Sequence, residues 1–93
     1  MSLELLDAAT VGHELPMWTL EGVSVVRTDV AASFPAAIAW VVAVAEVAET
    51  MNHHPDIDIR FCRVTWRLTT HSAGGITRLD FDLARRIGAI VDA

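Results

Sequence analysis

The chain has 93 residues, of which 53% are hydrophobic, and a formal net charge of -5. This length suits one domain, expected to cover residues 1–93, and the apolar content argues against disorder. All seven basic residues are arginines and they form no cluster, which argues against direct contact with nucleic acid. The single cysteine, Cys62, cannot form an internal disulfide, so we expect a cytoplasmic protein.

Neither a signal peptide nor a membrane span is expected. No basic residue precedes Arg27, and the chain does not begin with an apolar run. The longest apolar run, residues 34–45, is shorter than the roughly 20 residues that a transmembrane helix needs.

The first 30 residues predict a short helix and a β-hairpin. Helical spacing covers residues 2–9, with Ser2 as its cap, Gly12 as its end and His13 in a polar loop beyond it. Residues 16–20 and 23–29 read as strands joined by a two-residue turn at Glu21-Gly22. Trp18, beside the first strand, is expected to anchor the core.

A long apolar helix is predicted over residues 34–51, capped by Ser33. One stripe is expected to comprise Phe34, Ile38, Val41, Val42, Ala45 and Ala48, with Trp40, Val44 and Val47 off it. Because no charge precedes Glu46, the helix is apolar nearly all round and predicts burial on more than one side. We therefore expect a homodimer or homotetramer, with Val44 facing the partner; burial within one monomer core is the alternative.

The second half predicts two more strands and a final helix. Apolar and polar residues alternate over 57–61 and 64–69, with a turn or bulge near Cys62-Arg63. A loop follows at 72–75, and Thr77 with Asp80 resembles a capping box that opens the last helix. The order helix, two strands, helix, two strands, helix predicts an α+β fold, an antiparallel sheet with helices on one face.

Titratable residues gather at the end of the long helix and around the last strand. Glu49 and His53 are four residues apart, so they share a helix face if the helix continues that far. A nearby carboxylate and a helix C-terminus both favour a protonated imidazole, which suits a general acid. Adjacent residues of an extended chain point to opposite faces, so His53 and His54 are expected to do different jobs. His71 lies at a strand end beside a glycine-containing loop.

Three other interpretations of this group remain open from the residues alone. The histidines before Pro55 can simply cap the helix. Glu49, His53 and His71 can form a metal site of two imidazoles and one carboxylate, but no further ligand follows a known spacing, so we expect no metal. The group can also bind a ligand without chemistry. Asp80 is expected to cap the last helix.

The spacing of these residues resembles the signature of the pterin-4a-carbinolamine dehydratases: Glu49-x3-His53-His54-Pro55-x5-Phe61-x9-His71-x8-Asp80. The likeness extends to Trp18, the helix over 34–48, the loop over 70–75 and Asp80-Phe81. Phe61 stands where tyrosine is common in that family, and Cys62 where asparagine is common.

The resemblance implies a four-stranded antiparallel sheet with three helices on one side, assembled as dimers or tetramers without metal or cofactor. It implies loss of water from 4a-hydroxytetrahydropterin to give quinonoid dihydropterin, which recycles tetrahydrobiopterin. His53 and His71 would then be the acid–base pair. The implied supporting residues are His54, which binds or orients the pterin, Glu49, which tunes a histidine, and the pterin contacts Thr70 and Asp80. The rival function is a non-enzymatic scaffold that binds protein partners.

Overall fold

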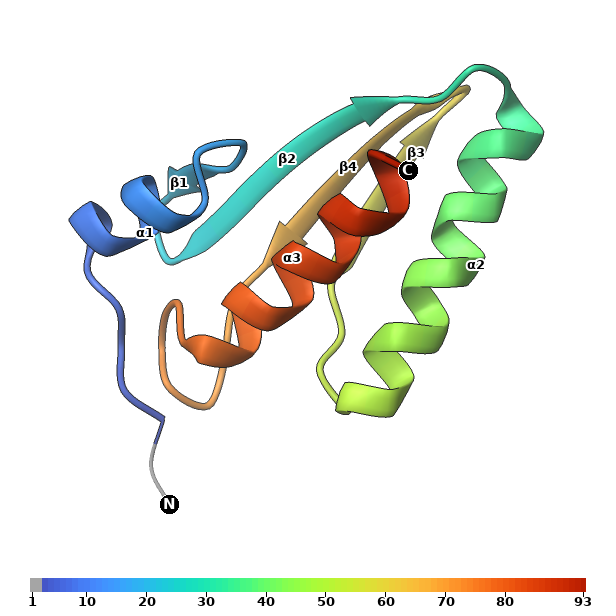
Figure 1. Ribbon diagram of the computed structural model, residues 1–93. Helices are drawn as coiled ribbons and strands as arrows, with labels where there is room; N and C mark the ends of the chain where they lie inside the picture. Colours follow the sequence, from blue (N-terminus) through green and yellow to red (C-terminus); the bar gives the residue numbers. More distant parts are fainter. Residues whose placement is uncertain (1–2) are drawn as a thin grey trace.

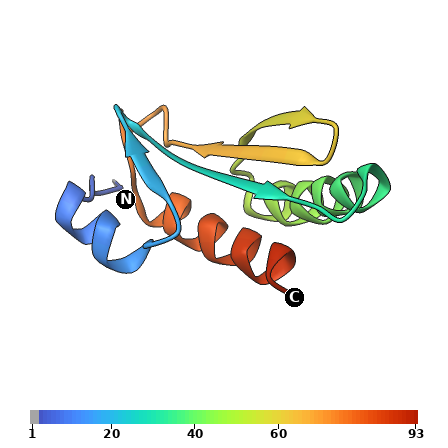
Figure 2. The same ribbon diagram turned by 90° about the horizontal axis from the view of Figure 1, so that it is seen from above.

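The computed structural model describes residues 3–93 and confirms the predicted α+β fold (Figure 1). The elements in chain order are α1 (Ala8–Glu14), β1 (Thr19–Glu21), β2 (Ser24–Val30), α2 (Phe34–Met51), β3 (Asp56–Arg60), β4 (Arg63–Leu68) and α3 (Arg78–Val91). The strands form one antiparallel sheet in the order β1-β2-β4-β3. Figure 2 shows all the helices on one side of this sheet.

The core lies between the sheet and the helices. Alternate residues of β4 point into it, and Val64, Trp66 and Leu68 are all buried. Phe81 and Ile87 cover them from α3. On the opposite face, β3 and β4 present the polar residues Asp56, Asp58, Arg63, Thr65 and Arg67, as the strand alternation predicts.

The first helix begins later than the sequence suggested. Ser2 lies outside the described residues, and α1 starts after Asp7, whose carboxylate accepts the Thr10 backbone N–H at 2.8 Å. Hydrogen bonds from Thr10 lower the pKa of Asp7. Gly12 and His13 lie inside this helix and do not follow it, so both placements were wrong. The aspartate cap satisfies a free backbone N–H of the first turn, which apolar spacing does not, so the cap determines where this helix begins.

Both hairpin turns contain a residue with left-handed backbone. The first turn is Gly22-Val23, one residue later than predicted, and Gly22 has φ 59°. The second turn is Phe61-Cys62, close to the predicted position, and Phe61 has φ 55° with 74% of its surface exposed. Glycine adopts such a φ without strain, whereas a bulky residue rarely does.

Helix α2 has the predicted bounds and cap but buries a different face. The Ser33 hydroxyl accepts the Ala36 N–H at 3.2 Å. The residues buried on the helix are Ala37, Val44 and Ala48, while Val42, which was expected in the stripe, is 54% exposed. Val44 therefore faces the core of its own chain and not a partner. The outer face remains apolar, and by length and composition alone α2 is the one helix within residues 3–93 that could cross a membrane.

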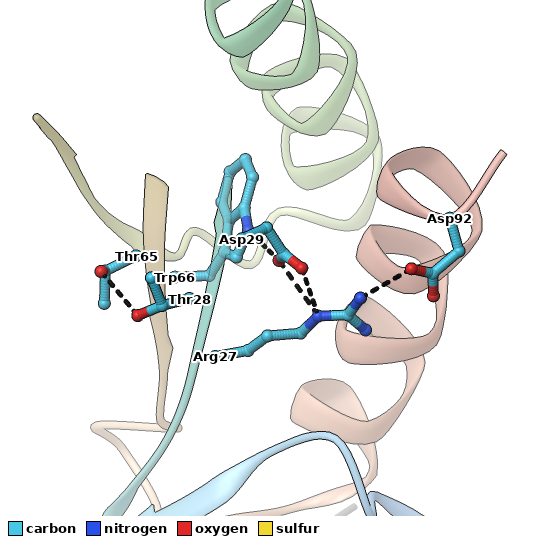
Figure 3. Close-up of polar contacts among 6 residues, drawn as sticks. All are labelled: Arg27, Thr28, Asp29, Thr65, Trp66 and Asp92. Carbon is cyan, nitrogen blue, oxygen red and sulfur yellow. Dashed lines mark hydrogen bonds and ion pairs between the residues drawn. The ribbon is translucent and has the colours of Figure 1, made fainter. Parts of the chain in front are cut away.

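Arg27 forms a buried ion pair with Asp29 within β2 and also reaches the exposed Asp92 at the end of α3 (Figure 3). The Arg27 side chain is only 5% exposed, and its Nε donates to both Asp29 oxygens at 3.0 Å. Its Nη2 donates to Asp92 at 2.8 Å, and Trp66 Nε1 donates to Asp29 at 3.0 Å. Asp29 is thus the shared acceptor for two buried donors. On the opposite face of the sheet Thr28 and Thr65 share a 2.9 Å hydrogen bond.

Candidate active site

The end of α2 directs His53 away from the helix. Asn52 closes the helix in left-handed conformation, φ 50°, and its N–H donates to the Ala48 and Glu49 carbonyls. The chain turns there, and Pro55 then leads into β3. His53 consequently leaves the helical path and lies against the start of α3.

The His53 ring is held by a buried carboxylate. Its Nε2 lies 2.7 Å from Asp80 Oδ1, and the two side chains are 10% and 0% exposed. Asp80 belongs to the first turn of α3, so it caps that helix as predicted. The Asp80 side chain has no exposed surface, and its carboxylate contacts the His53 ring directly.

The second oxygen of Asp80 is also fully engaged. Its Oδ2 accepts the Thr70 hydroxyl at 2.6 Å and the Thr77 N–H at 2.9 Å. The Thr70 and Thr77 hydroxyls are 2.8 Å apart. Thr70, expected as a pterin contact, thus directs its hydroxyl to Asp80. The sequence identified Thr77 only as a cap, because nothing in the spacing shows that its hydroxyl meets Thr70.

Glu49 pairs with His54 and not with His53, contrary to our expectation. The distance from Glu49 Oε2 to His54 Nε2 is 2.9 Å, and both side chains are exposed, 81% and 57%. The four-residue rule requires a continuous helix, and α2 ends at Met51, before either histidine. The neighbouring histidines do have different partners, as their alternation predicted.

A pocket of about 320 Å³ joins four of the predicted site residues, whereas Glu49 and Asp80 do not line it. The residues that line it are Asn52, His53, His54, Thr69, Thr70, His71, Ser72 and Leu79. His71 is exposed on the turn that follows β4, where a bridge between Thr70 and Gly75 closes the loop. The β3–β4 hairpin brings these segments together, because antiparallel pairing places the start of β3 beside the end of β4. The sequence had not identified Asn52, Thr69, Ser72 or Leu79.

The alternative metal site of Glu49, His53 and His71 does not assemble among the described residues. Within residues 3–93 no group of three or more histidine, cysteine, aspartate or glutamate side chains is arranged to hold an ion. Glu49 and Asp80 each take a different histidine, so the carboxylates are separated.

Comparisons with known proteins identify the family to which this fold belongs. Residues 2–90 match the family described as pterin 4 alpha carbinolamine dehydratase. A Nocardia farcinica protein, named as such a dehydratase on a provisional basis, is 57% identical over 90 residues, which cover 94% of this chain and 95% of that protein. A similarly named Chloroflexus aurantiacus protein is 52% identical over 89 residues, 92% of this chain and 96% of that one.

A solved structure shares the whole architecture. The transcriptional coactivator/pterin dehydratase from Brucella melitensis superposes with a TM-score of 0.88 at 29% identity, covering 95% of this chain and 99% of that one. The fold is that of a family of small hydro-lyases. The chain belongs to the pterin-4a-carbinolamine dehydratase family.

Proposed function

We propose that this protein removes water from 4a-hydroxytetrahydropterin by histidine acid–base catalysis to give quinonoid dihydropterin, which a separate two-electron reduction returns to tetrahydrobiopterin. The single observation that carries the proposal is the pocket in which His53, His54 and His71 meet. Family membership supports the substrate class. We also propose that the enzyme works in the cytoplasm, because its single cysteine suits a reducing compartment.

The reaction needs one proton given and one proton taken. The bond from C4a to its hydroxyl breaks, and the oxygen leaves as water after it gains a proton. A ring N–H loses its proton, and its electrons form the new double bond. Imidazoles exchange protons near neutral pH, so His53 and His71 can fill both roles without a metal or cofactor.

The supporting side chains differ in how firmly they are held. His53 is fixed by Asp80 at 2.7 Å in a nearly buried position, so it is the better-oriented acid or base. His54, with Glu49 beside it, lies at the exposed rim and can contact or orient the ring of the pterin. Thr70 acts on the site through its hydrogen bond to Asp80, and because it also lines the pocket its methyl group can contact the ligand.

The test is a dehydratase assay on enzymatically generated carbinolamine. The wild-type protein should accelerate water loss, and His53→Ala should lose roughly 100- to 10,000-fold of that acceleration. His13→Ala is the matched control, because His13 lies on α1 and does not line the pocket. A wild-type rate no faster than the uncatalysed one would reject the enzyme assignment.

A second candidate function, a dimerisation or assembly scaffold, is favoured by the outer face of α2. Phe34 and Val42 on this helix are 48% and 54% exposed. The Brucella melitensis relative is described as both a coactivator and a dehydratase. Binding of a protein partner that survives His53→Ala would support the scaffold, and its loss would tie binding to the pocket.

A further inference from the structure

The hydrogen bonds behind His53 can be assigned a single direction. A threonine hydroxyl has one proton, and a carboxylate has none to give. Thr70 donates its proton to Asp80 Oδ2 at 2.6 Å, so the 2.8 Å bond between the two hydroxyls must use the proton of Thr77. The Thr77 oxygen in turn accepts the Leu79 N–H at 3.3 Å. The chain of donors therefore runs from Leu79 through Thr77 and Thr70 to Asp80.

The same assignment fixes the proton on His53. When Asp80 is ionised it offers only acceptors, so Nε2 of His53 donates across the 2.7 Å contact. Nδ1 then has no other partner within residues 3–93. No buried polar side-chain atom of the described chain lacks a hydrogen-bond partner, so Nδ1 must reach the surface, where His53 lines the pocket. Nδ1 is therefore the nitrogen available to a ligand.

We propose that Thr77 and Thr70 are positioning residues: their hydroxyls fix the Asp80 carboxylate so that His53 presents Nδ1 to the substrate. This inference rests on the proposed dehydratase function, and it adds Thr77, which touches neither the pocket nor the histidine. Thr70, Thr77 and Asp80 are 3%, 0% and 0% exposed, so water does not replace a lost hydroxyl easily.

Helix capping alone does not account for this geometry. A capping box needs the Thr77 oxygen and one Asp80 oxygen. The capping box is complete, and in it the Thr77 oxygen only accepts hydrogen bonds. The proton of the Thr77 hydroxyl is not needed for the cap and goes to Thr70 at 2.8 Å, and Thr70 in turn donates to Asp80 at 2.6 Å. The Thr77 hydroxyl therefore serves the carboxylate as well as the helix.

The first test reads the protonation site of His53 directly. Two-bond ¹⁵N–¹H spectra distinguish the two neutral tautomers of a histidine ring, and His53 is assigned by comparison with His53→Gln. The wild-type spectrum should show the Nε2–H form. Thr77→Val and Thr70→Val, which remove one hydroxyl each, should populate the Nδ1–H form or an exchanging mixture. This test needs no substrate, so it stands or falls separately from the dehydratase assignment.

The second test separates positioning from stability. At metal centres, mutating a residue that orients a ligating histidine typically lowers activity or metal affinity by roughly 10- to 100-fold. Thr77→Val should lower kcat about tenfold with KM changed less than twofold, and Thr77→Ser should recover most of that loss. Ser33→Ala is the matched control, because it removes the N-cap hydroxyl of α2, which is outside this hydrogen-bond chain. It should lower the melting temperature without altering kcat or the His53 spectrum.

The outcomes are distinct. A changed tautomer and a lower kcat in Thr77→Val and Thr70→Val, restored by serine, support the positioning role. Wild-type spectra and kcat in both valine variants would overturn it, and so would the same changes in Ser33→Ala. Should Thr77→Val fail to fold, Thr70→Val gives the same reading from the other hydroxyl. An inactive wild-type protein with the expected spectra rejects the proposed function but leaves the hydrogen-bond chain supported.

Discussion

Removal of the Asp29 carboxylate should be far more damaging than the loss of any exposed ion pair. Asp29→Ala takes the acceptor from two buried donors, Arg27 Nε and Trp66 Nε1 (Figure 3). Arg27 would retain only Asp92, which is 63% exposed. Breaking one side of a buried pair costs roughly 3–5 kcal/mol, and because Asp29 is 15% exposed the lower end applies, about 3 kcal/mol. A chain of this length has a total stability of roughly 5–14 kcal/mol.

Urea unfolding followed by tryptophan fluorescence measures this effect. With an m-value of about 1.5 kcal/mol per M, the midpoint should fall by roughly 2 M. Asp92→Asn is the control, and its exposed pair should cost less than about 1 kcal/mol. Arg27→Met combined with Asp29→Ala should regain part of the loss, because no charge is then left buried. An Asp29→Ala midpoint no lower than that of Asp92→Asn would refute the reasoning.

Three further predictions concern the site and its assembly. If His53 and His71 each serve one face of the pterin, each alanine variant should slow the dehydration of one C4a epimer and spare the other. Stopped-flow traces of a mixture of epimers should then be biphasic, whereas equal slowing of both epimers contradicts this division. Light scattering at micromolar concentration should show a dimer or tetramer that Val42→Glu weakens, and a stable wild-type monomer contradicts this assembly. Val44→Glu should instead unfold the protein, because the side chain of Val44 is 0% exposed. Elemental analysis should find no stoichiometric metal and chelators should leave activity intact; a bound equivalent of iron or zinc, lost together with activity, contradicts the metal-free mechanism.

Local signals in the sequence were sufficient for most of the fold. Ser33 and the Thr77-Asp80 pair mark helix starts through hydrogen bonds within four residues, so α2 and α3 began where predicted. Alternation predicted β3 and β4 in the same way, whereas β1 begins at Thr19 and not at Pro16, where the first strand was predicted. The face of α2 could not be predicted, because a helix that is apolar all round gives periodicity no contrast, and tertiary packing selected Val44 over Val42.

The candidate site was predicted in its members but not in its pairings. The histidines were found through their spacing and residue type. The partner of His53 depends on the left-handed turn at Asn52, which no rule for continuous helices includes. Asp80 lies 27 residues from His53 along the chain, and only the docking of α3 beside the hairpin brings them together. The function of Thr77 beyond its cap was hidden for the same reason.

The strand order has a consequence for how the chain could be divided. Every proposed site residue lies between Glu49 and Asp80, around the β3–β4 hairpin, whereas β1 and β2 contribute none. Yet β2 is the inner neighbour of β4, and without it β4 would become an open edge prone to association with other chains. A protein split in the connection between β2 and α2 would carry all its proposed chemistry on one fragment. The other fragment would pair with the open edge of β4 and so complete the sheet. We therefore expect the fragment that carries the site to become active only when the two fragments are mixed.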